Sequence, residues 1–142
     1  MDYSELADVF LRHMHSFRKF KPQQRINESM QGEAFALHHI ATSDGQVMPS
    51  EISNAVGISG ARIAATLNSL ENKGYITRQI DARDRRRILV TLTDKGKEQE
   101  EAYRRQLVET VEKMLRQLGE HDAQEYIRIM LKVAELAECN DL

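Results

Sequence analysis

The chain has few residues of the kinds that stabilise small secreted proteins. Among its 142 residues Cys139 is the only cysteine, which excludes an internal disulfide framework and fits a reducing cytoplasm. Tryptophan is absent and aromatic residues make up only 6%, so that the core must be formed by Leu, Ile, Val, Met and Ala. This mixture favours helices. We therefore expect a mainly α-helical protein.

Long apolar segments are also missing. The longest apolar runs are far shorter than the roughly 18 residues that a membrane-spanning helix needs, and the N-terminus lacks the apolar core of a signal peptide. There are two prolines and no low-complexity tract, while 41% of the residues are hydrophobic. The length suits one domain or two small lobes that share a core. We expect a soluble cytoplasmic protein.

Charge is distributed unevenly along the chain. The formal net charge is −2, which argues against a general polyanion binder. From Ser59 to Thr93, however, seven cationic side chains face three anionic ones, a local net charge of +4. A basic patch confined to one segment is typical of a surface that faces DNA.

The same segment has the pattern of two short helices. Pro49 suits the first position of a helix that extends to about Val56, and Gly57-Ile58-Ser59 forms a short turn. Ser59 can cap the next helix and Gly74 can end it in the left-handed conformation. Its apolar residues recur at helical spacing on one side, at Ile63, Leu67 and Leu70.

A hairpin is predicted directly after these helices. Two extended runs, 75–80 and 88–92, are separated by the charged residues 81–87, and Val47-Met48 is a candidate short strand that pairs with them. Two helices joined by a glycine-containing turn can place the second one in the major groove, which is about 12 Å wide. Helices and hairpin together predict a winged helix-turn-helix.

Short motifs follow one another in a fixed order from residue 51 to residue 96. They are Glu51-Ile52, Gly57-Ile58-Ser59, Leu70-Glu71-Asn72-Lys73-Gly74-Tyr75-Ile76, Arg78, Asp81, Asp84-Arg85-Arg86 and Val90-Thr91-Leu92-Thr93-Asp94-Lys95-Gly96. In this order and spacing they resemble the MarR family of bacterial transcription regulators. The resemblance implies a homodimer that binds double-stranded DNA at a palindromic operator, most often as a ligand-responsive repressor.

Flanking helices extend the resemblance over nearly the whole chain. Residues 1–20 carry an apolar stripe, and residues 20–27 break the helical pattern. A helix from about Glu28 to Thr42 has Met30, Ala34, Leu37 and Ala41 facing inward, and a long helix follows the N-cap candidate Thr93. Gly119 precedes a last helix, in which Asp122 is a capping candidate and Tyr126, Ile127, Met130, Val133, Leu136 and Ala137 form the buried stripe. We expect a helical dimerisation lobe from residues 1–27 and 94–142, and a DNA-binding lobe from residues 28–93. The first helix could instead pack only on its own chain.

The second helix of the pair supplies the candidate base readers. Arg62 can donate two hydrogen bonds to a guanine edge, although it could also contact only phosphate or remain in solvent. Many relatives carry Thr-Arg where this chain has Ala64-Ala65, and an arginine where it has Ser69. The candidate DNA-binding residues of this helix and its flanks are Ser50, Ser59, Gly60, Ala61, Arg62, Ala65, Thr66, Asn68, Ser69 and Lys73, of which Ser50, Ser59 and Lys73 would contact phosphate.

The hairpin tip supplies the remaining DNA candidates. Asp84 and Arg86 match the family's Asp-x-Arg pattern, which implies that the acid steadies the hairpin while the arginine enters the minor groove. We expect Arg83, Arg85, Arg86 and Arg87 to contact DNA and Asp84 to be structural. A solvated charge run is the alternative interpretation.

An effector site is implied by the resemblance, because members of the family often bind a small aromatic or anionic ligand between their two lobes. The candidate residues are Phe10, His13, Met14, Phe17, Phe35, His38 and His39, although a Met or Phe on a helical stripe is more often simply core. No metal or other cofactor is expected, because the five histidines include no His-x3-His pair and cysteines are not paired.

Other functional classes find less support in the sequence. Peroxide-sensing relatives use a cysteine in the first helix, whereas Cys139 lies near the C-terminus. A nucleophile elbow, a phosphate loop and a zinc-protease motif are all absent, so we do not expect an enzyme. The alternative to a DNA-binding regulator is a helical dimer whose basic hairpin binds an acidic protein.

Overall fold

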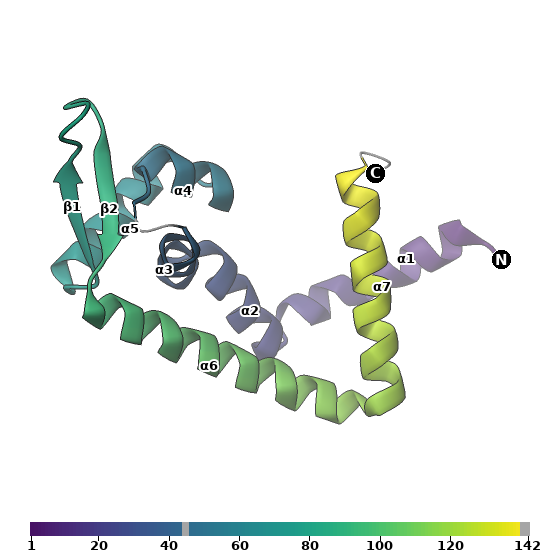
Figure 1. The fold of residues 1–142 in the computed structure, drawn as a ribbon. Coiled ribbons are helices and arrows are strands. Elements are labelled where there is room, and N and C mark those ends of the chain that lie inside the picture. The colour runs from purple at the N-terminus through teal and green to yellow at the C-terminus, as the bar shows by residue number, and fades with distance from the viewer. Residues whose placement is uncertain (44–45, 140–142) are drawn as a thin grey trace. The chain divides into compact units, whose positions relative to one another are not determined.

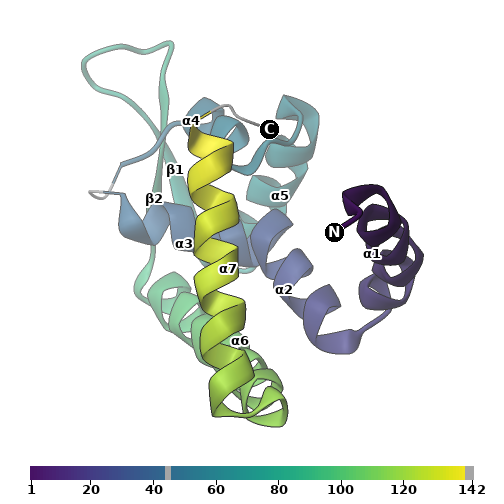
Figure 2. The ribbon, with the colours of Figure 1, turned by 90° about the vertical axis from the view of Figure 1, so that its right-hand side faces the viewer.

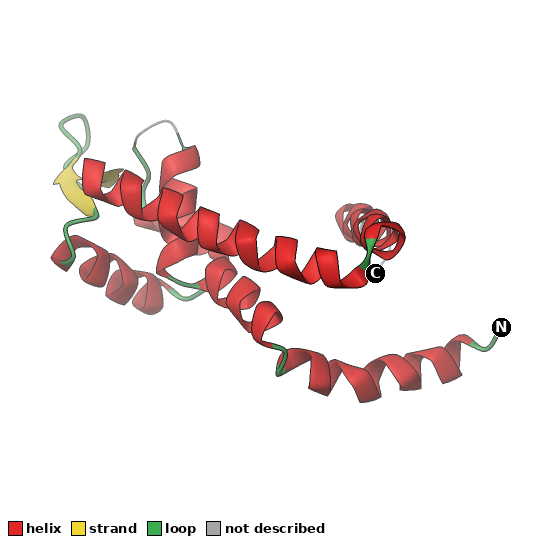
Figure 3. Cartoon of the chain, turned by 90° about the horizontal axis from the view of Figure 1, so that it is seen from below, coloured by secondary structure: helices red, strands yellow, loops and turns green. Residues whose placement is uncertain are grey.

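Helices make up most of the chain, and a two-stranded hairpin interrupts them (Figures 1 and 3). The structure is a computed structural model that describes residues 1–43 and 46–139, with only the backbone described for residues 28–31. The elements are α1 (Tyr3–Arg18), α2 (Lys21–Gln31), α3 (Glu33–Thr42), α4 (Pro49–Val56), α5 (Gly60–Asn72), β1 (Ile76–Ile80), β2 (Ile88–Leu92), α6 (Asp94–Leu118) and α7 (Glu120–Glu138). The chain forms two compact units, Met1–Leu107 and Val108–Leu142.

Local capping signals set the ends of α4 and α5. Pro49 begins α4, and the Glu51 carboxylate accepts a hydrogen bond of 3.0 Å from the backbone N–H of Met48. The Oγ of Ser59 caps α5 by accepting from the N–H of Arg62 at 3.3 Å. Gly57 and Gly74 have φ angles of 72° and 79°, a region that favours glycine. The predicted helix-turn-helix is therefore confirmed.

One apolar core joins α3, α4, α5 and the hairpin. Ile63, Leu67 and Leu70 of α5 are buried, as their spacing predicted. They pack with residues from the neighbouring helices and strands, namely Ala36, Leu37, Ile40, Val47, Ile52, Ile76 and Val90. Burial of one face of α5 fixes which of its residues remain on the surface.

The hairpin extends from this core with an antiparallel register from Ile76↔Leu92 to Ile80↔Ile88. Val47 adds a bridge to Val90, in which each backbone N–H donates to the other residue's carbonyl, at 3.2 and 2.8 Å. The expected pairing of the 47–48 segment with the wing is therefore confirmed. Beyond Ile80 and before Ile88 the loop reaches away from α4 and α5 (Figure 2).

The start of α6 is locked against the end of α5. Thr93 Oγ1 accepts from the N–H of Gly96 at 3.0 Å and donates to the carbonyl of Gly74 at 2.6 Å, which confirms its expected role as an N-cap. At Gly96 a Cβ atom would collide with the Tyr75 carbonyl. Only glycine fits this close approach. The wing and α6 thus meet at a fixed point.

Three expectations about the N-terminal half were wrong. The break expected at residues 20–27 is confined to Lys19 and Phe20, because Lys21–Gln31 is helical, and the expected helix 28–42 is divided, because a separate helix begins at Glu33. Pro22 falls in the first turn of α2, where its missing N–H costs no helical hydrogen bond, and a second break occurs at Gly32, which is extended with φ −120° and ψ −155°. Ala41 is exposed, while the expected inward direction of Met30 concerns a side chain outside the described ones.

The apolar stripes of the outer helices are not buried within the chain. On α1, Phe10 is 64% exposed, and Leu6, Val9, Met14 and Phe17 are also exposed. On α7, Met130 and Val133 are about half exposed in the single chain, so the expected burial of this stripe would require a partner surface. Gly119 precedes α7 with φ 83°, but a side-chain cap is absent there, so Asp122 does not act as one. Among the described residues, none of the helices has the length and apolar character needed to cross a membrane.

Candidate nucleic-acid interface

The outer face of α5 is small and polar. Gly60, Ala61, Arg62 and Ala65 are exposed on the side away from the buried Leu67. A Cβ at Gly60 would meet no atom within 4 Å, so there is open space at the start of the helix. A backbone that carries such short side chains can approach the floor of a groove closely.

The polar groups of this face are partly engaged by the helix itself. The Thr66 hydroxyl donates to the Arg62 carbonyl at 3.0 Å, which leaves its methyl group and its oxygen lone pairs for other contacts. Arg62 is exposed one turn earlier, where the structure brings it together with Ala65 and Thr66. Ser50 is exposed in the first turn of α4.

Ser69 and Lys73 contact α3 instead of facing outward together with Arg62. The Ser69 hydroxyl donates to Glu33 Oε1 at 2.6 Å, and Lys73 Nζ donates to Glu33 Oε2 at 2.7 Å. Burial would raise the pKa of Glu33, but hydrogen bonds from Lys73 and Ser69 and the charge of Lys73 together lower it. These two DNA candidates are therefore engaged in holding α5 against α3.

Arg78 on β1 forms a second polar link to α5. Its Nε and Nη2 donate to the two carboxylate oxygens of Glu71, each at 3.0 Å, and Nη2 also donates to Asn68 Oδ1 at 2.7 Å. Hydrogen bonding to Arg78 lowers the pKa of Glu71, and the same bond raises the pKa of Arg78. Sequence reasoning noted Arg78 only as part of a motif. The link requires the hairpin register, which places Arg78 beside the last turns of α5.

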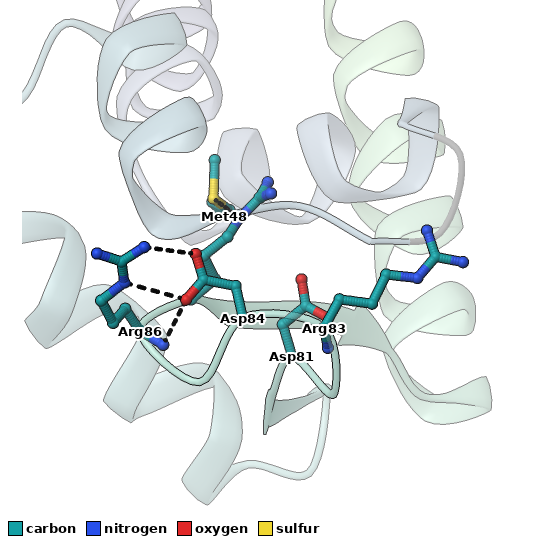
Figure 4. A network of polar contacts seen from close by, with 6 residues as sticks. Met48, Asp81, Arg83, Asp84 and Arg86 are labelled. Atoms are coloured by element: carbon teal, nitrogen blue, oxygen red, sulfur yellow. Dashed lines mark hydrogen bonds and ion pairs between the residues drawn. The ribbon is translucent and has the colours of Figure 1, made fainter.

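The wing loop is organised by two aspartates (Figure 4). Asp84 Oδ1 accepts from the backbone N–H of Arg86 at 3.1 Å and from Arg86 Nε at 3.2 Å, while Asp81 Oδ1 accepts from the N–H of Arg83 at 2.9 Å. The hydrogen bonds from Arg86 lower the pKa of Asp84. The Arg86 side chain is 90% exposed although its Nε and Nη2 both donate to the Asp84 carboxylate, which therefore holds the guanidinium at the surface of the loop.

The other wing arginines lie on the same loop with different surroundings. Arg83 and Arg85 are exposed, and Arg87 Nε contacts the sulfur of Met48 at 3.1 Å. This contact ties the end of the loop to the residue before α4. The loop thus combines projecting cations with attachments to the helical core, which is an arrangement suited to reaching a polyanion.

Comparison with known proteins identifies this arrangement. The model of a family described as a winged helix DNA-binding domain matches residues 34–111, which is more than half of the chain. The chain belongs to this family. The matched segment includes α5, the wing and the first part of α6, and so contains both parts of the candidate interface.

Individual relatives support the same class. YwaE from Bacillus subtilis, an uncharacterized HTH-type transcriptional regulator, is 28% identical over 59% of this chain and 56% of its own length. The match therefore spans little more than half of YwaE. A MarR transcriptional regulator from Methanosarcina mazei has a TM-score of 0.67, 21% identity and coverage of 97% of this chain and 99% of its own. Streptococcus pneumoniae FabT, solved in complex with DNA, has a TM-score of 0.66, 22% identity and coverage of 96% and 98%. The expected winged helix fold of the MarR type is confirmed.

The candidate effector residues of this winged helix chain do not form one cluster of described contacts. Phe17 stacks on Phe20, with ring centroids 6.4 Å apart, whereas Phe35 stacks on His39 at 6.3 Å. His38 Nδ1 lies 3.0 Å from Glu100 Oε1 on α6. Phe10, His13 and Met14 are exposed on α1. Within residues 1–43 and 46–139, a grouping of three or more His, Cys, Asp or Glu side chains that could hold a metal ion is absent.

Proposed function

We propose that this protein is a sequence-specific DNA-binding transcription regulator in which α5 enters the major groove and the wing reaches the minor groove. The observation that carries the proposal is the combination of an exposed small face on α5 with an arginine-tipped wing attached to the same core. Arg62 reads a base edge, Arg85 and Arg86 contact the wing-side groove, and Ser50 and Ser59 contact phosphates. Relatives described as regulators, one of them bound to DNA, support this assignment.

The proposed active form is a homodimer. Apolar side chains along α1 and α7 are exposed in the single chain, including Phe10, Leu131 and Val133 at 64%, 57% and 51%. Regular apolar stripes of this kind need a partner surface, and a second copy of the chain supplies matching stripes. We assign the dimerisation lobe to residues 1–27 and 94–142, of which residues 140–142 lie outside the described part.

A symmetric dimer sets the form of the target. Two copies of α5 related by a two-fold axis match a near-palindrome whose half-sites are about 10 base pairs, one helical turn, apart. Occupying such a site represses transcription where it overlaps a promoter. A small aromatic or anionic effector would release the DNA by favouring a dimer with a different spacing of the two α5 helices. The candidate effector residues are those on α1 and α3.

Selection of bound fragments from the source genome tests the proposal. Purified protein is incubated with sheared genomic DNA, and bound fragments are sequenced and compared for a shared near-palindrome. The selected duplex should compete at least 1,000-fold better than random duplex of equal length. Binding with little sequence preference, together with capture of an acidic protein through the wing, would favour the alternative of a protein-binding module. The candidate effector is then tested as loss of operator binding in a panel of small aromatic acids.

A further inference from the structure

We infer that Arg78 is a positioning residue, which holds the side chain of Asn68 so that its amide nitrogen is presented to DNA as a hydrogen-bond donor. The inference rests on the proposed function and adds Arg78, a residue that does not itself contact DNA. The orientation of the Asn68 amide then decides which chemical groups of the operator Asn68 can recognise.

The geometry fixes which end of the Asn68 side chain faces the wing. Arg78 Nη2 lies 2.7 Å from Asn68 Oδ1. A guanidinium carries only donors, so the atom that it meets must be the carbonyl oxygen and not the amide nitrogen of Asn68. The usual ambiguity between the two ends of an asparagine amide is therefore removed by its partner. Asn68 is exposed, and its Nδ2 carries two N–H groups.

Glu71 makes Arg78 a rigid support. The two carboxylate oxygens of Glu71 accept from Nε and Nη2 of Arg78, each at 3.0 Å. A two-pronged pair of this kind restricts the guanidinium plane, whereas a lysine at the same position would act as a point charge. The side chain of Arg78 is 28% exposed, so it is held between strand and helix and is less available to DNA than Arg86, which is 90% exposed.

The fixed amide changes what Asn68 can recognise. Asparagine commonly reads adenine by donating to N7 while accepting from N6, which uses both ends of the amide. Here Oδ1 is already engaged by Arg78, and only Nδ2 is presented without a competing charged partner. Asn68 should therefore prefer acceptors, which are phosphate oxygens, guanine O6 or N7, adenine N7, or thymine O4. Adenine at the contacted position should lose the advantage over guanine that the two-ended contact normally gives it.

A double-mutant comparison tests this role. Arg78→Met alone would leave the Glu71 carboxylate without its ion-pair partner, so the pair is removed together as Glu71→Gln, Arg78→Met. The pair is made in the wild-type background and in the Asn68→Ala background, and affinity for the selected operator is measured at several salt concentrations. A neutral hydrogen bond contributes roughly 0.5–1.5 kcal/mol. At about 1.36 kcal/mol for each tenfold change, this predicts a loss of roughly 2- to 13-fold for Asn68→Ala and for the pair.

The loss of affinity in the wild-type and Asn68→Ala backgrounds shows whether Arg78 positions Asn68 or only supports the fold. If Arg78 acts through Asn68, the paired change weakens binding only while Asn68 is present. It leaves the salt slope unchanged, because the Glu71–Arg78 pair carries no net charge and the side chain of Asn68 is neutral. Arg78→Lys should restore little of the affinity, since one ammonium cannot hold both partners. An equal loss in both backgrounds, or no loss in either, overturns the inference.

A measurement without DNA keeps the inference distinct from the proposed function. In ¹⁵N-labelled free protein, the side-chain NH₂ of Asn68 should be ordered in the wild type and become mobile in the paired variant, while the backbone spectrum shows that the fold is kept. An Asn68 amide that stays equally ordered in the variant overturns the positioning role. If wild-type protein prefers no genomic fragment, the proposed function fails together with the donor role, but the NMR result still decides whether Arg78 positions Asn68.

Discussion

Replacing Arg86 by alanine should weaken DNA binding and leave the fold intact. The Arg86 side chain is 90% exposed, and its Nε and Nη2 donate to the carboxylate oxygens of Asp84 at 3.2 and 3.4 Å. The alanine variant keeps the backbone hydrogen bond of 3.1 Å from residue 86 to Asp84. The wing loop should therefore keep its shape, and the melting temperature should not change measurably.

The size of the effect follows from counterion release. Each phosphate neutralised by a cation contributes about 0.9 to the slope of log K against log salt. Loss of one such contact should lower the slope by about 0.9, and a dimer that loses one contact at each of its two wings should lose about 1.8. Over a four-fold rise in salt concentration, each lost contact should therefore make the fall in affinity roughly 3.5-fold smaller than in the wild type.

Fluorescence anisotropy with a labelled operator duplex measures this slope from about 50 to 200 mM salt. Arg104→Ala is the matched control, because Arg104 is also an exposed arginine but lies on α6, outside the proposed DNA-binding surface. The control should retain both the affinity and the slope of the wild type. If Arg86→Ala behaves like this control, the wing does not contact DNA through Arg86 and its assignment is wrong.

Three further variants test the core, the polar links and the dimer. Leu67→Ala should lower the free energy of unfolding by roughly 2–5 kcal/mol in urea, because Leu67 is 1% exposed in the core that carries α5. The pKa of Glu33 is lowered in the folded protein, so its carboxylate contributes stability that is present above the unfolded-state pKa near 4.5 and is lost as pH falls through the folded-state pKa. Glu33→Gln should therefore flatten the decline of melting temperature below about pH 5. Val133→Asp places a charge on the exposed apolar face of α7 and should shift sedimentation from dimer to monomer, whereas an unchanged dimer would remove this face from the interface.

The elements around the interface were predictable because their signals are local. Pro49, Ser59 and Gly74 each act within a few residues of their own position, and the observed α4 and α5 begin and end where these residues indicate. The same holds for β2, an extended run whose start was marked by the charged residues 81–87 before it. Helix α2 was missed because Pro22 and a run of polar residues resemble a loop, although proline is tolerated in a first turn.

Contacts between distant residues could not be inferred in the same way. Helical periodicity places Ser69 and Lys73 near the exposed side of α5, and on that basis they are DNA candidates. Their partner Glu33 precedes them by 36 and 40 residues, and only the packing of α3 against α5 brings its carboxylate within 2.6 and 2.7 Å. Arg78 is nearer in sequence to Glu71 and Asn68, but its link still depends on the turn at Gly74 and on the register of β1.

The contacts of Glu33 and Arg78 with α5 also reduce the part of the helix that is free to contact bases. Glu33 engages the α3 side of α5 through Ser69 and Lys73, and Arg78 engages its wing side through Glu71. A phosphate that recruited Lys73 would have to compete with a carboxylate 2.7 Å away, whereas the exposed Arg62 forms no ion pair with another described residue. Base discrimination should therefore depend most on the first two turns of α5, where the side chains are short, and on the donor that Asn68 presents just after them. The residues beyond Asn68, among them Ser69, Glu71 and Lys73, should serve mainly to hold the helix against α3 and the wing.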